Sequence, residues 1–362
     1  MKIGIDIQAS RGQVTGLGVY TKHLAEALLK EKRNGWEFLL FKKESSGNLN
    51  TAQRLFWENV ALPRLAKNQG VEILHTAAFA PPFFKPCKGV ATVHDLIGMI
   101  FPNALGGPSR FYWGKWLPLT LRKADALIAD SENTKKDIVS LLKIPEERVK
   151  VIYPSGHEGF APCSDSEVLR SLRDRFGIKE KYFLCVGTLE PRKNLVRILE
   201  AFAKFKESGK SATAYQLVVV GSKDFAHGRF FRLIQEKCPA LAEKNILFTG
   251  YIEQKNLNLL YSGAEAFLFP SLYEGFGIPV LEAMASGTPV LTSSTSSLPE
   301  VAGEAGFYVD PRDTEAIAEG IRTLAGQPGL REELIRKGFE RIRRFSWSQT
   351  ALETLKVYEA LS

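Results

Sequence analysis

Two carboxylates stand on either side of a glycine-rich turn in the segment 270–282. The apolar run before this segment is typical of a buried strand. Pro279 suits the first turn of a helix, because its missing N–H would have no partner there. Glu274 is therefore predicted in the loop after the strand, and Glu282 is predicted on the helix. Carboxylates in these places can accept hydrogen bonds from the hydroxyl groups of a ligand.

The glycines of the same turn indicate what else the ligand carries. Gly275 and Gly277 let the backbone approach a ligand closely. The N–H groups at the helix start, together with the positive end of the helix dipole, favour phosphate. The combination predicts a site for a molecule with both phosphate and hydroxyl groups, such as a sugar nucleotide. For a lone Gly-Phe-Gly, a tight turn before a capped helix would be an equally good interpretation.

A second segment with charged chemistry is the turn from Gly187 to Asn194, which follows an apolar run. It brings two adjacent cations, Arg192 and Lys193, to the start of a predicted helix. Cations and helix-end N–H groups stabilise the negative charge that grows on a departing diphosphate. A solvated basic turn is the alternative interpretation of these residue types.

The first half of the chain offers two further candidates. Gly16 and Gly18 open a predicted helix after the first strand, but their spacing does not make a nicotinamide fingerprint, which argues against a dehydrogenase. His94 and Asp95 follow another buried strand, at the end where ligands of parallel sheets bind. A lone histidine is more often structural. His94 is therefore predicted either to be structural or to orient a hydroxyl group.

Short strands alternate with helices along the whole chain, which predicts parallel sheets covered by helices on both faces. The predicted strands are 2–7, 37–41, 73–75, 90–93, 126–129, 149–152, 182–186, 216–220, 246–248, 266–269, 290–292 and 307–309. The predicted helices of the first half are 20–30, 53–68, 110–121 and 134–142. The polar stretch 153–166 interrupts the alternation, and 362 residues are many for one core. We therefore expect an α/β protein of two doubly wound domains.

The spacing of Glu274 and Glu282, with seven residues between them, resembles the signature of retaining glycosyltransferases of family four, which have the GT-B fold. The resemblance continues to Glu300 and extends over the whole chain. It implies two facing Rossmann-like domains with a cleft between them. Residues 1–165 would bind the acceptor, and residues 166–345 would bind the nucleotide sugar. The final helix, about residues 346–362, would pack back on the N-terminal domain.

The resemblance also implies roles for individual residues. Glu274 would contact the sugar hydroxyls of the donor, and Glu282 the nucleotide ribose. The implied catalytic residues are Glu274, His94, Arg192 and Lys193, and the implied acceptor-side residues are His94 and Asp95. The implied donor-binding residues are Gly16, Gly18, Gly187, Arg192, Lys193, Gly221, Tyr251, Glu274, Gly275, Phe276, Gly277, Leu281 and Glu282. Many relatives have Arg where this chain has Thr188, so either Arg192 or Lys193 could be the main cation.

The mechanism that the resemblance implies needs no metal and no cofactor beyond the nucleotide-sugar substrate. The acceptor attacks from the face that the diphosphate leaves, and that phosphate takes the proton. The protein supplies position and charge compensation. The chain has no Asp-x-Asp metal motif, which agrees with this expectation.

The donor and the overall reaction are less closely defined. The segments 186–194 and 271–277 resemble those of GDP-mannose-dependent mannosyltransferases of surface polysaccharide synthesis. We expect transfer of a hexose, most readily mannose, to a saccharide or lipid-linked acceptor in cell-surface polysaccharide, lipopolysaccharide or glycolipid synthesis. A UDP-sugar donor, a nucleotide-sugar 2-epimerase and a non-catalytic sugar-nucleotide-binding subunit are the alternatives.

Composition limits the partners. The net charge of +8 suits a polyanion, an anionic membrane face or a phosphorylated substrate, but dispersed basic residues without a binding motif argue against nucleic acid. The segment 110–123 mixes aromatic and cationic residues. It is predicted either to contact the inner membrane surface or to be a half-buried helix, with Phe111, Trp113 and Trp116 in the core or the interdomain cleft.

The remaining features concern location. No 18-residue apolar run and no signal peptide are recognised, so the expected location is the cytoplasm, with peripheral contact at the cytoplasmic face of the membrane. Scattered cysteines indicate reduced packing residues and no zinc site: Cys87, Cys163, Cys185 and Cys238.

Overall fold

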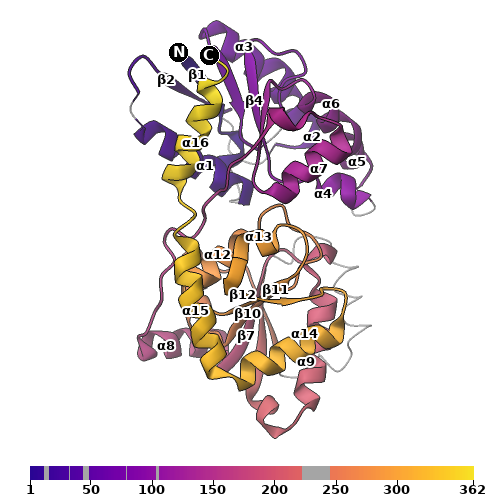
Figure 1. Cartoon of the computed structure of the whole chain (residues 1–362), viewed down its shortest axis with the longest axis vertical. Coiled ribbons are helices and arrows are strands. Elements are labelled where there is room, and N and C mark those ends of the chain that lie inside the picture. Colours follow the sequence, from indigo (N-terminus) through magenta and orange to yellow (C-terminus); the bar gives the residue numbers. More distant parts are fainter. Residues whose placement is uncertain (12–15, 32, 44–48, 79, 103–105, 222–244) are drawn as a thin grey trace. The chain divides into compact units, whose positions relative to one another are not determined.

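A computed structural model describes residues 1–11, 16–31, 33–43, 49–78, 80–102, 106–221 and 245–362 of the chain (Figure 1). They form two compact units. Unit 1 contains Met1–Ser155 and Phe345–Ser362, and unit 2 contains Gly156–Arg344. The boundary expected after residue 165 therefore lies inside unit 2. The reason is local bonding, because Ala161 and Cys163 donate their backbone N–H groups to Asn258 and Ser262 of unit 2.

Unit 1 is built on a parallel sheet with the strand order β2-β1-β3-β4-β5-β6. Its strands are β1 (Lys2–Asp6), β2 (Glu37–Phe41), β3 (Ile73–Thr76), β4 (Lys88–Val93), β5 (Ala126–Ala129) and β6 (Val149–Val151). The sequence of strands along the chain changes direction between β1 and β3, which pair directly. In doubly wound folds such a switch point lies beside the ligand site.

Two helical runs of unit 1 contain a π-helical turn that the sequence pattern did not predict. Residues 53–68 were expected as one helix, but α2 (Thr51–Phe56) passes through the π turn Trp57–Ala61 into α3 (Leu62–Asn68). The expected helix 110–121 is likewise divided into α5 (Gly107–Phe111), the π turn Tyr112–Trp116 and α6 (Leu117–Leu121).

A proline explains both π turns. Pro63 and Pro118 each stand at the second position of the helix that follows the π turn. Proline has no N–H to donate, and its ring would collide with the carbonyl group four residues earlier. The wider π turn carries the chain past this carbonyl without ending the helix.

The other helices of unit 1 are α1 (Gly16–Lys30), α4 (Ile97–Ile100), α7 (Glu132–Leu142) and α16 (Trp347–Glu359). Although α16 follows unit 2 in sequence, it packs beside α1 (Figure 1). Trp347, Leu355 and Tyr358 of α16 are buried in the same cluster as Ile3 and Leu24. The last helix thus completes the core of unit 1.

Unit 2 contains a second parallel sheet, with the order β12-β11-β10-β7-β8-β9. Its strands are β7 (Lys181–Val186), β8 (Tyr215–Val220), β9 (Ile246–Gly250), β10 (Ala266–Phe269), β11 (Val290–Ser293) and β12 (Gly306–Val309). The switch point lies between β7 and β10. Every strand predicted from the sequence is present in one of the two sheets, with ends within two residues of the predicted ones.

The helices of unit 2 cover both faces of this sheet (Figure 1). They are α8 (Ser166–Phe176), α9 (Leu195–Glu207), α11 (Gln254–Ser262), α12 (Ile278–Ala285), α13 (Leu298–Ala302), α14 (Thr314–Gly326) and α15 (Pro328–Ile342). On one face α9 packs against α14 over a core that includes Phe183, Phe202 and Leu217. The sheet is thereby a rigid support for the loops that leave its strands.

Candidate active site

Two predicted segments leave neighbouring strands at the switch point of unit 2. The basic turn follows β7 and ends in the short 3-10 helix Pro191–Lys193, and the Glu274 loop follows β10. Because β7 and β10 are paired parallel strands, their carboxyl ends meet at one edge of the sheet. The two loops are also bonded directly, since Leu272 N–H donates to the Arg192 carbonyl at 2.8 Å.

Glu274 pairs with both predicted cations. Its Oε2 lies 2.8 Å from Arg192 Nη1, and its Oε1 lies 2.7 Å from Lys193 Nζ. Arg192 also donates from Nε to Glu190 at 2.7 Å. The Glu274 side chain is only 8% exposed, so these ion pairs lie largely out of water.

This pairing sets the charge of the cluster. Burial alone would raise the pKa of Glu274, but Lys193 and Arg192 outweigh it and hold the pKa below its usual value. Burial, together with the neighbouring charge of Arg192, lowers the pKa of Lys193 although Glu274 acts to raise it. Glu274 is consequently ionised at neutral pH, beside two groups that attract phosphate.

Asn194 holds the basic turn in place, a role that the sequence did not reveal. Its φ of 62° is left-handed, which lets the chain turn from the 3-10 helix into α9. The buried side chain donates from Nδ2 to the carbonyls of Pro270, at 2.9 Å, and Pro311, at 2.6 Å. The first of these bonds fixes the end of β10. An Asn before a predicted helix is the only signal in the sequence, and it suggests a cap rather than a cross-link.

Two serines hold the loop of Glu274, and they were also missed. Ser296 Oγ accepts from the Glu274 N–H at 3.1 Å. Ser297 Oγ is bonded to the carbonyls of Glu274, at 3.0 Å, and Phe276, at 2.8 Å. These serines lie more than twenty residues further along the chain, so only the fold brings them to the site.

Glu282 lies on α12, as predicted, and accepts a hydrogen bond from Tyr261 at 3.0 Å. Burial raises the pKa of Glu282 to about 7. Gly277, with a φ of 109°, caps α12 in the left-handed region, where a Cβ would lie 2.8 Å from Leu298. The turn therefore requires glycine for backbone reasons, whatever it binds.

The other predicted donor residues of unit 2 differ in their surroundings. A Cβ on Gly221 would lie 2.0 Å from the Gly187 carbonyl, so these two glycines let the ends of β7 and β8 approach. Tyr251 is 72% exposed, whereas Phe276 is buried. Leu281 is fully buried, so its side chain packs inside unit 2 and is not available to a ligand in this structure. Gly275 is buried in the loop next to Glu274.

Unit 1 contains the remaining predicted residues. Gly16 and Gly18 begin α1, and a Cβ on Gly18 would lie 2.6 Å from the Ala9 carbonyl. His94 follows β4, with Nδ1 2.6 Å from Asp130 and Nε2 2.8 Å from the Ala77 carbonyl. Asp95 accepts from the Ile97 N–H at 3.0 Å. Since both ring nitrogens of His94 have partners, the role of orienting a substrate hydroxyl is not available to it in this conformation.

A buried acidic pair in unit 1 was not predicted. Asp6, at the end of β1, accepts from Trp57 Nε1 at 3.2 Å, and Glu58 accepts from the Tyr112 hydroxyl at 2.8 Å. Burial raises the pKa of Asp6 to about 6 and that of Glu58 to about 8. One signal in the sequence could have indicated that Glu58 is buried. It stands four residues before Leu62, so on a helix the two residues lie on the same face, and Leu62 is buried.

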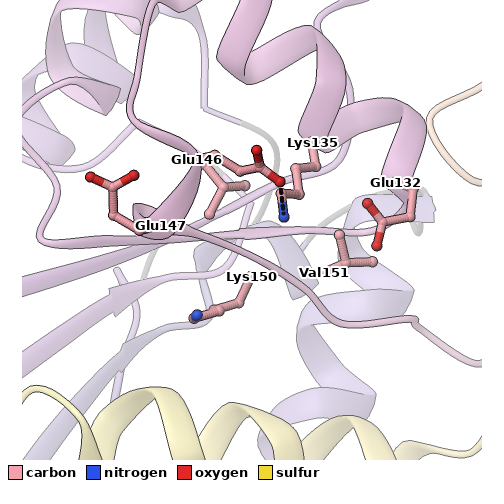
Figure 2. Close-up of a pocket in the computed structure, with 7 residues that line it drawn as sticks. Glu132, Lys135, Glu146, Glu147, Lys150 and Val151 are labelled. Carbon is pink, nitrogen blue, oxygen red and sulfur yellow. Dashed lines mark ion pairs between the residues drawn. The ribbon is translucent and has the colours of Figure 1, made fainter.

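A surface groove of about 510 Å³ lies at the edge strand β6 (Figure 2). Lys135 of α7 and Glu146 point toward one another there, with Nζ and Oε1 2.9 Å apart. Ser131 precedes the groove and caps α7 by accepting from the Thr134 N–H at 3.0 Å. The groove therefore offers a solvated ion pair rather than a catalytic group.

Comparison with known proteins defines the class of this site. Residues 170–341 match the family of glycosyl transferases group 1, and residues 14–155 match glycosyltransferase family 4. The solved structures that it resembles include sucrose-phosphate synthase of Thermosynechococcus elongatus, with a TM-score of 0.78, 22% identity and coverage of 100% of this chain and 99% of that one. WaaG, a glycosyltransferase involved in lipopolysaccharide biosynthesis, gives a TM-score of 0.74 at 18% identity, with coverage of 98% and 99%.

Sequence relatives are closer. O-antigen chain mannosyltransferase B of Escherichia coli is 30% identical over 284 residues, which are 78% of this chain and 73% of that protein. The serotype-specific mannosyltransferase WbdA of Escherichia coli is 31% identical over 274 residues, and this chain spans only 32% of its length. The chain therefore belongs to the family four glycosyltransferases, and it is a glycosyltransferase with the GT-B fold, as its resemblance implied.

Proposed function

We propose that this glycosyltransferase is a retaining mannosyltransferase that uses GDP-mannose to extend a cell-surface polysaccharide. The observation that carries the proposal is the cluster of Glu274, Arg192 and Lys193 at the switch point of unit 2. It offers two cations to a diphosphate and one carboxylate to sugar hydroxyls within a single buried group. The start of α9, directly after Asn194, adds backbone N–H groups and a positive dipole end.

The choice of mannose and of the polysaccharide rests on the relatives. Three of them are named as mannosyltransferases of O-antigen or of a serotype: mannosyltransferase B, WbdA and RfbU. Anabaena HepE, a solved structure with a TM-score of 0.72, was determined with UDP and glucose, so the fold itself accommodates another donor. Glu282 is proposed to bind the ribose, and the pair His94 and Asp95 is proposed to belong to the acceptor side.

The chemistry follows from this arrangement. The acceptor hydroxyl attacks the anomeric carbon from the face that the diphosphate leaves, the C–O bond to phosphate breaks, and the leaving phosphate takes the proton. Arg192 and Lys193 stabilise the charge that grows on it. We propose that no metal takes part. Addition of EDTA is then expected to leave the rate unchanged, and a rate that EDTA abolishes and magnesium restores would contradict this part of the proposal.

One assay tests the donor and the reaction together. GDP-, UDP-, dTDP- and ADP-sugars are first compared by thermal shift, where a ligand at 100 times its Kd stabilises by about 2.7 kcal/mol. The ligands that bind are then incubated with and without octyl α-mannoside. Transfer from GDP-mannose with an α-linked product supports the proposal. Transfer from a UDP-sugar changes the donor, and an epimerised donor without acceptor indicates an isomerase.

We also propose that unit 1 contacts an anionic membrane surface, where a lipid-linked acceptor would be found. No helix among the described residues is long and apolar enough to cross a bilayer, so the contact would be peripheral. Phe84 and Phe111 are 79% and 55% exposed, and Lys123 Nζ lies 3.7 Å from the centre of the Phe83 ring. Trp113 and Trp116 are half-buried against the core of unit 1, as the second expectation for the segment 110–123 had them. Phe111 was expected with them but is exposed, so it is available to the proposed contact.

A further inference from the structure

The environment of His94 determines its protonation. Nδ1 lies 2.6 Å from the Asp130 carboxylate, and Nε2 lies 2.8 Å from the Ala77 carbonyl oxygen. A neutral imidazole has one N–H and one lone pair. A neutral His94 would therefore place its lone pair against one of these two oxygens, neither of which can donate a hydrogen bond unless the Asp130 carboxyl group is protonated. With both nitrogens protonated, the ring satisfies both contacts.

The surroundings retain the charge. The side chains of His94 and Asp130 are only 14% and 6% exposed, so water screens their attraction weakly. Burial by itself lowers the pKa of His94, but Asp130, the Ala77 carbonyl and Asp95 together raise it above the usual value. The titratable groups around the pair are His75, kept neutral because burial lowers its pKa, and Tyr20, whose ring packs edge-on against His94 at 4.5 Å.

The pair also connects three strands. Ala77 directly follows β3, His94 directly follows β4, and Asp130 directly follows β5. These strands are neighbours in the sheet, so the two hydrogen bonds that join Asp130, His94 and Ala77 connect the carboxyl ends of all three strands. The hydroxyl of Thr134, in the first turn of α7, adds a bond to the His94 carbonyl at 3.2 Å. The connection therefore sets the position of Asp95 and of the chain that leaves β3.

We propose that His94 is a charged imidazolium at neutral pH, that Asp130 is the positioning residue that keeps it charged, and that the pair holds the acceptor-side edge of unit 1 in place for transfer. His94 then exchanges no proton with the acceptor. This inference rests on the proposed function in one respect only, the assignment of unit 1 to the acceptor. The charge state of His94 is independent of that assignment.

The first measurement is NMR of protein labelled with ¹⁵N-histidine, between pH 6 and 8.5. We expect both His94 ring nitrogens to be protonated at pH 7 in the wild type. In Asp130→Asn the carboxylate charge is lost, so His94 should become neutral at pH 7. A wild-type His94 with a single N–H at pH 7 would overturn the proposal, whether or not the enzyme proves to be a transferase.

The second measurement separates positioning from general damage. With GDP-mannose and octyl α-mannoside, Asp130→Asn is expected to raise the KM for the acceptor about a hundredfold. Slow hydrolysis of GDP-mannose without acceptor should stay within twofold of wild type. Asp125→Asn is the matched control. Asp125 directly precedes β5, whereas Asp130 directly follows it, and the carboxylate of Asp125 also has a charged partner, Lys85, at 2.6 Å.

The results of the two measurements have distinct meanings. An unchanged acceptor KM in Asp130→Asn, or an equal loss of donor hydrolysis and transfer, would overturn the positioning role. Asp130→Glu, which keeps the charge, is expected to restore the NMR signature of the imidazolium and part of the acceptor affinity. If the wild type neither transfers nor hydrolyses any nucleotide sugar, the proposed function is wrong. The charge state of His94 is still decided by the NMR measurement, which does not depend on activity.

Discussion

Glu274 pairs with the same two cations that a diphosphate would need. A ligand phosphate must therefore compete with this carboxylate for Arg192 and Lys193. The sugar hydroxyls, in contrast, need Glu274 as their acceptor. At the scale of single residues, donor binding is thus an exchange of partners within a buried cluster. Loss of the Glu274 carboxylate is then predicted to have opposite effects on two quantities: the affinity for the nucleotide and the rate of sugar transfer.

Glu274→Gln is expected to bind GDP at least as tightly as the wild type, because the competing charge is gone. Its kcat/KM for transfer should fall about 100- to 1000-fold, since the amide does not replace the carboxylate toward the transferred sugar. Calorimetry with GDP and a transfer assay measure the two effects.

The control is Glu190→Gln. The Glu190 carboxylate pairs with Nε of Arg192 at 2.7 Å, whereas the Glu274 carboxylate pairs with both cations. The variant Glu190→Gln should also bind GDP at least as tightly as the wild type. Unlike Glu274→Gln, it should retain sugar transfer. Parallel loss of GDP affinity and transfer in Glu274→Gln would argue against the exchange of partners.

Glu58 gives a prediction about pH and stability. Its pKa, raised by burial to about 8, lies above the value of about 4.3 expected in the unfolded chain. The native state then holds more protons than the unfolded state between these values. Glu58 therefore contributes stability that is fully present below about pH 4 and is lost as pH rises through 8, by about 1.4 kcal/mol per pH unit.

Glu58→Gln cannot ionise, so the decline of the free energy of unfolding between pH 6 and 8.5 should become shallower. Urea titrations at several pH values measure it. Arg54, Asp6 and Tyr112 also affect this group, so the slope should be reduced rather than abolished. Glu147→Gln, at an exposed glutamate, should leave the slope unchanged. The prediction is wrong if Glu58→Gln and Glu147→Gln have the same slope.

The residues that carry charge were predictable, but their partners were not. Arg192, Lys193 and Glu274 stand out through residue type and spacing. Their pairing depends on β7 and β10 being neighbours across the switch point, which local patterns do not define. His94 was noticed for its place after a buried strand, and its bonds to Asp130 and Ala77 fit the structural alternative that was left open for it.

Backbone geometry at the ends of elements fixes where these side chains lie. The 3-10 helix of the basic turn meets α9 at Asn194, whose left-handed conformation and two carbonyl bonds determine the direction of both. The sequence predicted the turn and the helix. It could not show the junction between them, because Asn194 holds that junction through hydrogen bonds to two loops that are distant in sequence.

Two substitutions separate these contributions. Asn194→Gly keeps the left-handed backbone but loses the bonds to Pro270 and Pro311, at a cost of about 2–4 kcal/mol. Asn194→Ala loses the same bonds and should cost about 1 kcal/mol more through backbone strain. Urea unfolding of the two variants measures the difference.

Lys143 provides the control, since it is exposed and has a φ of 53° at the end of α7. Lys143→Gly relieves strain without removing a buried bond, so it should be neutral or slightly stabilising. Equal stability of Asn194→Gly and the wild type would show that the two carbonyl bonds contribute little.

The prolines behind the π turns illustrate a limit of pattern analysis at the element scale. Hydrophobic spacing predicted helices over 53–68 and 110–121, and helical chain is indeed present there. A proline inside such a pattern normally indicates an end or a kink. Spacing alone could not show that the chain would instead pass each proline in a π turn, because hydrophobic spacing does not report how the backbone accommodates a proline.

At the scale of the whole molecule, the sequence predicted the fold class and both sheets, because alternating strands and helices leave few arrangements. It placed the boundary inside unit 2, since polar composition does not reveal which unit a loop is bonded to. The net charge of +8 is a property of the entire chain, and it bears on the proposed membrane contact.

Sedimentation with vesicles tests that contact. The protein is expected to bind vesicles that contain anionic phospholipid more tightly than zwitterionic ones, and binding should weaken with salt. Phe84→Ser should reduce the affinity, and Lys123→Ala should reduce it about fivefold, which corresponds to about 1 kcal/mol per cation near the surface.

Val168→Ser is the matched control, because Val168 is an exposed apolar residue of unit 2. It should bind vesicles like the wild type. If Phe84→Ser and Val168→Ser reduce binding equally, the contact does not lie at the exposed Phe84 and Lys123 of unit 1.

The return of α16 to unit 1 has a consequence for how the protein is made. Unit 1 is split in sequence, and Gly156–Arg344 is synthesised between its two parts. At about 5–20 residues per second, the ribosome leaves the first part without its last helix for roughly 10–40 s. During that time the surface later covered by Trp347, Leu355 and Tyr358 stays uncovered. We expect the nascent chain to need protection by a chaperone over this interval, while unit 2 completes its fold first.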